Sequence, residues 1–475
     1  MTFVFYDTET TGLRIGFDQI VHFAAIKTDN DLNEIERFEI RSRLLPYVIP
    51  HPKALVTNGL PIDKLIDRSL PSHYQMVRQL RRRLLEWSPA IFVGFNSIRF
   101  DEEMLRQALF QTLHPAYLTN TSQNCRADAM GLALSASALA PDVLEIPLSD
   151  TGRPTFRLEK LAAANGIAIG ESHNAVTDTL STLGLCRLIK GEAPDVWQRF
   201  VRFSKKATVS QFVDDEDGFV LTEFYANEAY HTPVVSLGPD PTATSTRRLC
   251  LRLDVSIDHL TRLSDEELQA ELSKKPSPVR SVRTNAAPTL TALFDATEEM
   301  LGSRPFDEFE DIARRIKDDQ ALKDRLITTY DIAHPQLRTA AMPEHNIHTG
   351  FPDDDDAYRL ASFHKASWPE ALQLAMELSH EGLRTFGSRL VYCEARSQVP
   401  QDLRHEIECE LMDRLTVETP WGFTLQQAIS EIDDLLAQRR DRNGVLEGYR
   451  KYLSEREQKV AVRRAQLRSS PVNAA

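Results

Sequence analysis

The chain has 475 residues, more than one hydrophobic core usually serves, so two or three domains are expected. It has 56 Lys and Arg residues and 69 Asp and Glu residues, and the net charge of −13 argues against a uniformly basic nucleic-acid-binding protein. No apolar stretch of about eighteen residues is present, and a strand-like start at Thr2 leaves no room for a leader, so we expect no membrane span and a cytoplasmic location. The five cysteines lack paired or metal-ligand spacing and are expected to be reduced thiols.

The first expected strand, within residues 3–13, starts with apolar residues and ends in polar residues and glycine, as an interior strand does at a sheet edge. Asp7 and Glu9 lie two residues apart, and side chains at that spacing share one face of a strand. Two carboxylates in one small volume repel each other unless cations lie between them, and such hard oxygen ligands suit Mg²⁺ or Mn²⁺. The same spacing recurs at 214–216 and 265–267 in charged surroundings, so it does not identify a site by itself.

A second strand-like run covers residues 90–96 and leads to Asp101, after which residues 102–110 have the spacing of an amphipathic helix. Asp101 is therefore expected near the start of a helix, beside a sheet edge. An acid at that position either serves a metal site or only interacts favourably with the helix dipole, and both interpretations stay open for this residue alone.

The third candidate segment contains His173 and Asp178 and precedes a helical apolar pattern over residues 179–189. His173 falls in the approach to that helix, and Asp178 falls about one turn inside it. An acid held in a helix suits a rigid metal ligand, whereas a histidine on the approach suits a base that reaches a water molecule. A histidine next to Asn is also common as a surface or capping residue.

Taken together, these residues resemble the DEDD exonucleases of the histidine-containing subclass, whose motifs are Asp-x-Glu, a mid-domain Asp and His-x-x-x-x-Asp. All five positions are filled in order, by Asp7, Glu9, Asp101, His173 and Asp178.

Three longer segments narrow the resemblance to the bacterial exonuclease I family, which degrades single-stranded DNA from its 3′ end. They are residues 19–29, 94–103 and 156–167, and a weaker likeness continues at 279–288 and 390–400. A proofreading subunit or a small oligoribonuclease would not need the later segments.

The chain departs from that family in two places. Thr8 and Thr11 stand where the family often has aromatic residues, which leaves the metal ligands unaffected. Residues 118–123 lack the tryptophans of the family's DNA-contacting loop, so the way in which the strand is gripped is expected to differ.

The resemblance implies a two-metal-ion site. Asp7, Glu9 and Asp178 would hold one Mg²⁺ ion, Asp7 would bridge to a second, and Asp101 would hold the second largely through water, with Mn²⁺ as a substitute. Two such ions about 4 Å apart can activate a water molecule, relieve charge on the phosphate and stabilise the leaving oxygen. His173 would accept the proton of the attacking water, which requires the neutral imidazole that an ordinary pKa of about 6.5 supplies near neutrality.

Three residues are expected to contact the substrate: Glu9, Leu13 and Arg157. Leu13 follows Gly12 and is a candidate wedge against the last base, although ordinary packing under the sheet edge explains it equally simply. Arg157 is a candidate phosphate contact, with a surface pair to Glu159 as the alternative.

Two basic groups follow the nuclease segment. They comprise Arg199, Arg202, Lys205 and Lys206, with Trp197, Phe200 and Phe203 interleaved, and then Lys274, Lys275, Arg280 and Arg283. Aromatic faces that stack on bases, with cations along the backbone, suit non-specific single-strand binding. An amphipathic helix with aromatic core residues and solvated charges explains residues 197–203 equally well.

The expected fold class is α/β in three domains. Residues 1–192 are expected to form a ribonuclease H-like exonuclease domain with a mixed sheet, 193–345 a small β-barrel-like DNA-binding domain with helices, and 346–475 a helical C-terminal domain. The run Asp353–Asp356 is expected to be a solvated loop rather than a metal site, because consecutive acids on a loop diverge.

The predicted function is a two-metal-ion 3′→5′ exonuclease that hydrolyses single-stranded DNA to nucleoside 5′-monophosphates in DNA repair and recombination, acting as a monomer. One alternative substrate is single-stranded RNA or short oligonucleotides, because only sugar contacts distinguish the two backbones. A second alternative is a non-catalytic binding platform for DNA-repair partners. The resemblance also implies contact with the acidic C-terminal tail of single-stranded-DNA-binding protein.

Overall fold

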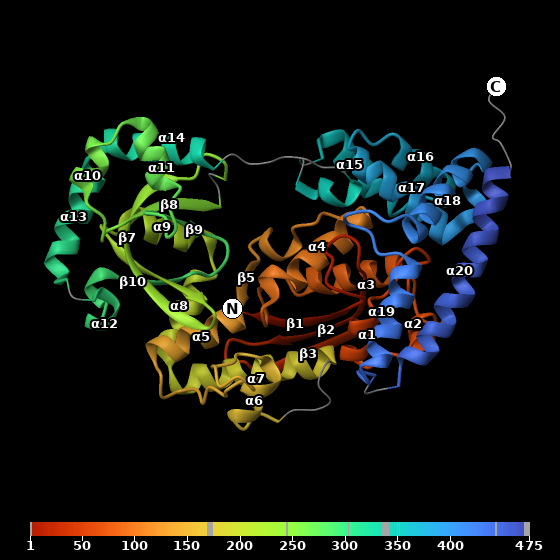
Figure 1. Ribbon diagram of the computed structural model, residues 1–475, viewed down its shortest axis with the longest axis horizontal. Coiled ribbons are helices and arrows are strands. Elements are labelled where there is room, and N and C mark those ends of the chain that lie inside the picture. Colours follow the sequence, from red (N-terminus) through yellow and green to blue (C-terminus); the bar gives the residue numbers. More distant parts are fainter. Residues whose placement is uncertain are drawn as a thin grey trace.

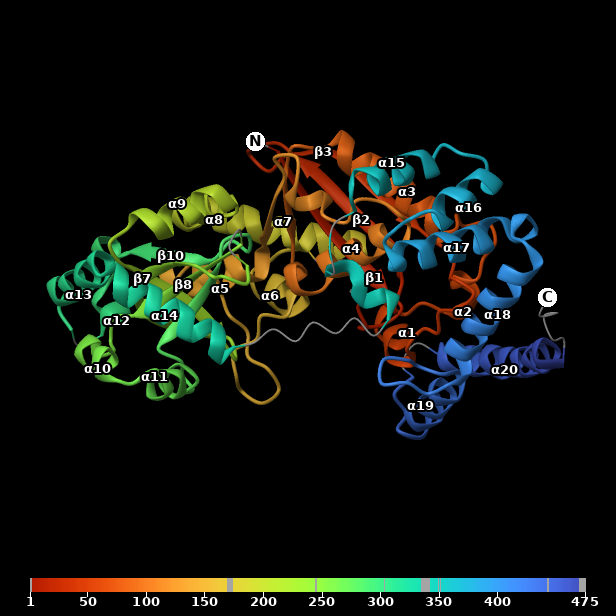
Figure 2. The same cartoon turned by 90° about the horizontal axis from the view of Figure 1, so that it is seen from above.

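The computed structural model describes residues 2–168, 174–243, 246–302, 304–334, 342–348, 350, 352–441 and 444–469. A nuclease part lies in the centre, a second β-sheet part lies on one side of it, and a helical part packs over the other side (Figure 1). The view from above shows the same order of the three parts (Figure 2). Within the described ranges, no helix has the length and the apolar character needed to cross a membrane.

The nuclease part contains a five-stranded sheet with helices on both faces. Its elements are β1 (Phe3–Thr10), β2 (Ile20–Thr28), β3 (Glu34–Arg41), α1 (Pro52–Asn58), α2 (Ile62–Leu65), α3 (His73–Glu86), β4 (Ile91–Gly94), η1 (Ser97–Arg99), α4 (Asp101–Gln111), η2 (Leu118–Asn120), β5 (Cys125–Asp128), α5 (Ala129–Leu139), α6 (Leu158–Ala164) and α7 (Ala175–Glu192).

The sheet has the order β3-β2-β1-β4-β5 and is mixed, as predicted, because β1 runs antiparallel to β2 and parallel to β4. Alternation along β1 divides its side chains between two cores. Phe3 and Phe5 pack against the α5 and α7 side, whereas Val4 and Tyr6 pack against α3 and α4. Figure 1 shows α3 and α4 on one face of this sheet and α7 on the other. Asp7 therefore continues on the α7 side, and residue 8 faces α4.

The middle part is built on an antiparallel sheet with the order β10-β6-β7-β8-β9. Its elements are α8 (Pro194–Phe203), α9 (Lys206–Asp215), β6 (Phe219–Tyr225), β7 (Glu228–Pro239), β8 (Arg247–Arg252), α10 (Ile257–Arg262), α11 (Asp265–Leu272), β9 (Val279–Arg283), β10 (Thr289–Ala292), η3 (Leu293–Asp295), α12 (Glu298–Leu301), α13 (Phe306–Asp318) and α14 (Gln320–Ala333).

Helix α8 resolves the two interpretations of the aromatic residues that follow the nuclease segment. Trp197, Phe200 and Phe203 are all buried, and the ring of Trp197 lies 5.4 Å from that of Phe3. The base-stacking interpretation is therefore wrong for these three residues, and the amphipathic-helix interpretation is correct.

The C-terminal part is helical, as predicted. Its elements are η4 (Pro343–His348), α15 (Asp354–Phe363), α16 (Trp368–Met376), α17 (Glu381–Ala395), η5 (Arg396–Gln398), α18 (Gln401–Thr416), α19 (Leu425–Ala437) and α20 (Leu446–Ser469). Helix α20 packs on the nuclease part, where the Tyr449 hydroxyl donates to the carbonyl of Pro50 at 2.7 Å.

The four-aspartate run is not a loop, and that prediction was wrong. Asp353 caps α15 by accepting a hydrogen bond from the backbone N–H of Asp356, and the following acids occupy the first helical turn, where the helix dipole favours them. Asp356 is fully buried and accepts hydrogen bonds from the backbone N–H groups of Ser379 and His380. The run therefore joins α15 to the start of α17.

Candidate active site

Three carboxylates converge at the edge of the nuclease sheet. Asp7 and Glu9 share one face of β1, as their spacing predicts, and Asp178 comes from the first turn of α7. Asn174 caps that helix by accepting a hydrogen bond from the N–H of Val176 at 3.0 Å, which fixes where the helix begins. Carboxylate oxygens of Asp7, Glu9 and Asp178 all lie within 4.8 Å of one another.

Asp101 approaches the same strand from the other face of the sheet. It is the first residue of α4, as predicted, and only 7% of it is exposed. The Thr8 hydroxyl donates a hydrogen bond to Asp101 Oδ1 at 2.5 Å. Asp128, at the end of β5, accepts backbone hydrogen bonds from Asn96 at 2.8 Å and from Ile98 at 3.2 Å, and so fixes the turn that carries Asp101.

The carboxylates are costly to ionise together. Burial, followed by the charges of Asp101, Glu9 and Asp178, raises the pKa of Asp7 well above its ordinary value. Burial and the charges of Asp178 and Asp101 raise the pKa of Glu9 to about 8. Bound cations would relieve this repulsion, and a set of carboxylate oxygens without sulfur ligands suits a hard divalent ion such as Mg²⁺ or Mn²⁺. The residues present therefore fit the metal site that the sequence predicts.

His173 lies outside the described residues, so its predicted role as the base stays a prediction. Its sequence position, five residues before Asp178, is the evidence that the chain offers.

Leu13 projects into solvent, with 81% of its surface exposed. The alternative of packing under the sheet edge is therefore excluded. A large exposed apolar side chain just past the strand that carries Asp7 and Glu9 is available to contact a ligand.

A cavity of about 1000 Å³ lies next to the carboxylates, and its lining includes Asp7, Asp178 and Arg157. Arg157 is exposed directly before α6, and among the described residues no carboxylate lies within ion-pair distance of it. The middle part closes one side of the cavity, because Asn227, in the turn between β6 and β7, donates a hydrogen bond to the carbonyl of Pro154 at 3.1 Å. Arg157 is therefore free to meet an anionic ligand that enters the cavity.

Sequence reasoning missed a buried carboxylate beside the site. Glu102 is 1% exposed and accepts hydrogen bonds from the hydroxyls of Tyr6 and Thr119, with the guanidinium groups of Arg106 and Arg126 at 3.1 and 3.3 Å. Arg126 also donates to the carbonyl of Asn285 in the middle part at 3.1 Å. The run of three acids at 101–103 was the available signal, but only the fold shows which of them turns toward the arginines.

The family model and the similar proteins that match this chain are all exonucleases. Residues 4–186 match the family model RNase_T, described as an exonuclease. The chain is 27% identical over 323 residues to exodeoxyribonuclease I of Haemophilus influenzae, an alignment that covers 63% of this chain and 67% of that protein. It is also 27% identical over 215 residues to exodeoxyribonuclease I of Escherichia coli K12, an alignment that covers 45% of each protein. The sequence alignment with the E. coli protein thus spans less than half of its length.

The similarity in structure extends further along the chain. Exonuclease I from Methylocaldum szegediense aligns with a TM-score of 0.81 at 22% identity, covering 96% of this chain and 99% of that one. E. coli exonuclease I in complex with a dA16 oligonucleotide aligns with a TM-score of 0.81 at 20% identity and the same coverage. These similarities establish the fold and confirm the resemblance to exonuclease I that the motifs indicate.

Proposed function

From the exonuclease domain at residues 4–186, we propose that the chain is a 3′→5′ exonuclease that hydrolyses single-stranded DNA to nucleoside 5′-monophosphates in DNA repair and recombination. The observation that carries the proposal is the cluster formed by Asp7, Glu9 and Asp178 beside a cavity of about 1000 Å³. A binding platform without catalysis would have no use for three carboxylates that repel one another.

In this proposal Asp7, Glu9 and Asp178 hold one divalent ion, and Asp7 and Asp101 hold a second, with Mg²⁺ as the expected metal and Mn²⁺ as a substitute. When bound, the ions would lower the pKa of water and neutralise charge that builds up on the phosphate and the leaving oxygen. The protein's own part is to hold the carboxylates in place, through the register of β1, the cap of α7 and the hydrogen bond from Thr8 to Asp101.

The remaining roles fall to residues around the cluster. His173 is assigned as the base that accepts the proton of the attacking water, on the spacing of its motif. Arg157, which lines the cavity, is assigned to a phosphate of the strand, and Glu9 and Leu13 are assigned to the terminal nucleotide.

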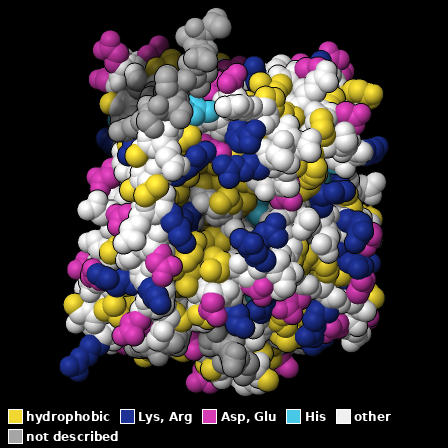
Figure 3. All heavy atoms as spheres, turned by 90° about the vertical axis from the view of Figure 1, so that its right-hand side faces the viewer, with side chains coloured by type: hydrophobic (Ala, Val, Ile, Leu, Met, Phe, Trp, Pro, Cys, Tyr) yellow, Lys and Arg dark blue, Asp and Glu magenta, His cyan; other side chains and the backbone are white. Residues whose placement is uncertain are grey.

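The charge distribution supports a single strand as the substrate. Figure 3 shows the end of the molecule on the right of Figure 1, where Lys and Arg side chains gather around a hollow floored by hydrophobic side chains, although the net charge is −13. In the middle part, Arg247 and Arg283 are partners in the register of β8 and β9, and burial, followed by the charges of Arg247 and Arg99, lowers the pKa of Arg283. Concentrated cations of this kind can follow a phosphate backbone.

Exposed aromatic residues accompany these cations on the middle part. Tyr225 and Tyr230 are 51% and 48% exposed, and their rings lie 5.6 Å apart at the β6–β7 hairpin. They supply the aromatic faces for base stacking that Trp197 and its neighbours do not.

The proposed partner rests on an aligned structure, and the proposed location rests on the state of the cysteines. One aligned structure is of exonuclease I with SSB and the inhibitor CFAM, and we propose the single-stranded-DNA-binding protein as a partner of this chain too. All five cysteines are free thiols, the state that a reducing compartment maintains, and we place a monomeric enzyme in the cytoplasm.

The experiment that tests this function compares matched 5′-labelled DNA and RNA single strands and a DNA duplex, with Mg²⁺ and with a chelator. The proposal expects progressive shortening of the DNA single strand, little cleavage of the duplex and no cleavage with chelator. Equal or faster shortening of RNA would favour the oligoribonucleotide alternative. Binding without cleavage under every metal condition would favour the platform.

A further inference from the structure

One tryptophan of the chain, Trp421, lies at the surface. The other three are Trp87, Trp197 and Trp368. Trp87 and Trp197 are buried, and Trp368 packs against an apolar cluster that joins the nuclease and C-terminal parts, whereas 51% of Trp421 is exposed. Tryptophan is enriched where proteins contact ligands and partners, so an indole left half exposed marks a candidate contact surface.

A tight turn between α18 and α19 presents this indole. The backbone N–H of Gly422 donates hydrogen bonds to the carbonyl oxygen of Thr419 at 3.2 Å and to its hydroxyl oxygen at 2.8 Å. Pro420 occupies the second position of the turn, where its fixed φ favours the bend, and Trp421 occupies the third. A Cβ atom on Gly422 would lie 2.6 Å from the Thr419 hydroxyl oxygen, so the turn is closely packed. Trp421 therefore projects from a well-defined turn.

That turn lies alongside the loop that follows β1. The guanidinium of Arg14 lies 5.0 Å from the centroid of the Phe423 ring. The centroid of the His345 ring lies 4.9 Å from that of Trp421 and 5.8 Å from that of Phe17. Because Arg14 and Phe17 both belong to the loop after β1, residues 421–423 of the C-terminal part run along this loop of the nuclease part.

The loop after β1 is itself held in one conformation. Asp18 accepts hydrogen bonds from the Thr11 hydroxyl at 3.1 Å and from the backbone N–H of Arg14 at 2.8 Å. A Cβ atom on Gly12 would lie 2.6 Å from Asp18 Oδ2, so the carboxylate fills the inside of the loop. Leu13, between these anchored residues, points into solvent. Leu13 and the indole are therefore two exposed apolar groups on adjoining segments, at the end of the strand that carries two of the clustered carboxylates.

We propose that Trp421 is a substrate-binding residue, whose indole stacks on a base of the single strand close to the terminal nucleotide assigned to Leu13. Stacking on an indole tolerates every base, because each has a flat π-face, so the contact adds affinity without sequence preference. Bases inside a duplex are covered by their neighbours, so the same contact favours a single strand. The inference takes its ligand from the proposed function, and it adds to the site a residue that the C-terminal part supplies.

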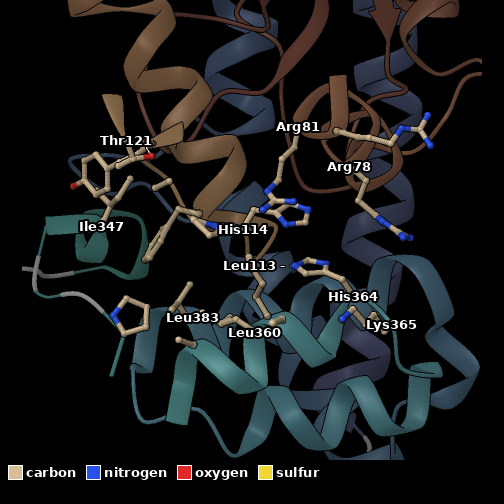
Figure 4. A pocket seen from close by; sticks show the side chains of 18 of the residues that line it. Arg78, Arg81, Leu113, His114, Thr121, Ile347, Leu360, His364, Lys365 and Leu383 are labelled. Atoms are coloured by element: carbon tan, nitrogen blue, oxygen red, sulfur yellow. Dashed lines mark hydrogen bonds between the residues drawn. The ribbon is translucent and has the colours of Figure 1, made fainter. Parts of the chain in front are cut away.

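A partner protein is the less suitable ligand for Trp421. The pocket between α3 and α15 has Arg78 and Arg81 on one side and Lys365 on the other, around an aliphatic floor (Figure 4). Those features suit the acidic tail of single-stranded-DNA-binding protein, the partner already proposed, and Trp421 is absent from the described lining of that pocket. Trp421 instead adjoins the loop next to the carboxylate cluster, where the 3′ end of a strand has to lie for cleavage.

The test titrates the full-length protein with an oligothymidylate in chelator, where no cleavage occurs, and follows both tryptophan emission and the anisotropy of a 5′ label. Binding should quench the emission of the wild type, because stacking brings a base against the indole. Trp421→Phe keeps an aromatic face, so it should lose the quenching and keep most of the affinity. Trp421→Leu should lose the quenching and weaken binding at least about fivefold. Trp368→Phe is the matched control and should keep the quenching and affinity of the wild type.

Two results would overturn the inference while the proposed function stands. One is quenching that persists in Trp421→Phe, and the other is equal affinity of the wild type and Trp421→Leu for the oligothymidylate. A wild type that binds no oligothymidylate would contradict the proposed function itself, and the inference with it. Melting temperatures near that of the wild type would show that the variants are folded. In Mg²⁺, Trp421→Leu should raise KM for the single strand while kcat stays close to that of the wild type.

Discussion

The Thr8 hydroxyl donates a hydrogen bond to Asp101 Oδ1 at 2.5 Å and joins the strand that carries two of the clustered carboxylates to the helix that carries the fourth acid. Thr8 faces α4, whereas its neighbours Asp7 and Glu9 face α7, so one strand positions acids that approach from both faces of the sheet. A polar residue between the two acids of the first motif therefore has a structural purpose in this chain.

Replacing that hydroxyl should impair catalysis without unfolding the protein. A hydrogen bond to a charged group contributes about 1.5–3 kcal/mol, so Thr8→Val is expected to lower kcat roughly tenfold or more and to raise the Mg²⁺ concentration needed for half-maximal rate. Thr8→Ser keeps the hydroxyl and should retain most of the activity. Equal kinetics for Thr8→Val and wild type would show that Asp101 needs no such support.

The raised carboxylate pKa values predict how stability depends on pH in the metal-free protein. The pKa of Glu9 is about 8 in the folded state against 4.5 for an ordinary Glu. Between these two pH values the folded state therefore binds more protons than the unfolded state. The free energy of unfolding should therefore fall as pH rises from 5 to 8, by at most about 1.4 kcal/mol per pH unit for this group. Mg²⁺ should raise the melting temperature more at pH 8 than at pH 5.

The control for that linkage is Glu9→Gln, which cannot lose a proton. Its melting temperature without metal should be higher than that of wild type at pH 8 and should fall less between pH 5 and 8. A wild-type stability that rises over the same interval would contradict the account of repelling carboxylates.

Leu13 should contribute to substrate binding and not to the stability of the fold. Because 81% of its surface is exposed, Leu13→Ala is expected to change the melting temperature by less than about 1 °C, while it weakens binding of a short single strand severalfold. Val462→Ala, on α20, removes a similarly exposed apolar side chain far along the chain and serves as the control. If Leu13→Ala binds the single strand as tightly as the wild type does, Leu13 does not contact the substrate.

Trp197 and Tyr225 should behave in opposite ways. Trp197 is 6% exposed and packs on the nuclease sheet, so Trp197→Ala is expected to cost about 3–5 kcal/mol of stability. Tyr225 is half exposed, so Tyr225→Ala should keep the melting temperature and weaken strand binding about tenfold, as loss of one stacked base does. Chemical denaturation and anisotropy with oligothymidylate distinguish the two effects.

Local patterns were enough to place Asp7, Glu9 and Asp178 on their secondary-structure elements. The two-residue spacing of Asp7 and Glu9 determines their shared face, and the helical spacing after Asp178 places it one turn inside α7. The same patterns could not show that Thr8 meets Asp101 or that Glu102 meets Arg126, since those contacts join residues more than twenty positions apart on different elements.

Tertiary contacts also explain the wrong predictions. Aromatic residues between cations have the same spacing on a stacking surface and on a packed helix, and only the contact of Trp197 with Phe3 decides between the two. Asp356 looked solvated because its partners, the N–H groups of Ser379 and His380, lie more than twenty residues further along the chain. The residues of the pocket between α3 and α15 could not be assigned from the sequence, because the two helices that supply its sides lie far apart in the chain.

The most direct test of the account is the rate at which wild type and Asp178→Asn release mononucleotide from a 3′-labelled DNA single strand in Mg²⁺. Asp311→Asn, an exposed acid on α13, is the matched control and should keep the wild-type rate. The account predicts immediate release of labelled mononucleotide by wild type and a loss of about a thousandfold in Asp178→Asn, about 4 kcal/mol of the barrier. Release at the wild-type rate by Asp178→Asn would contradict the assignment of the carboxylate cluster as the catalytic site.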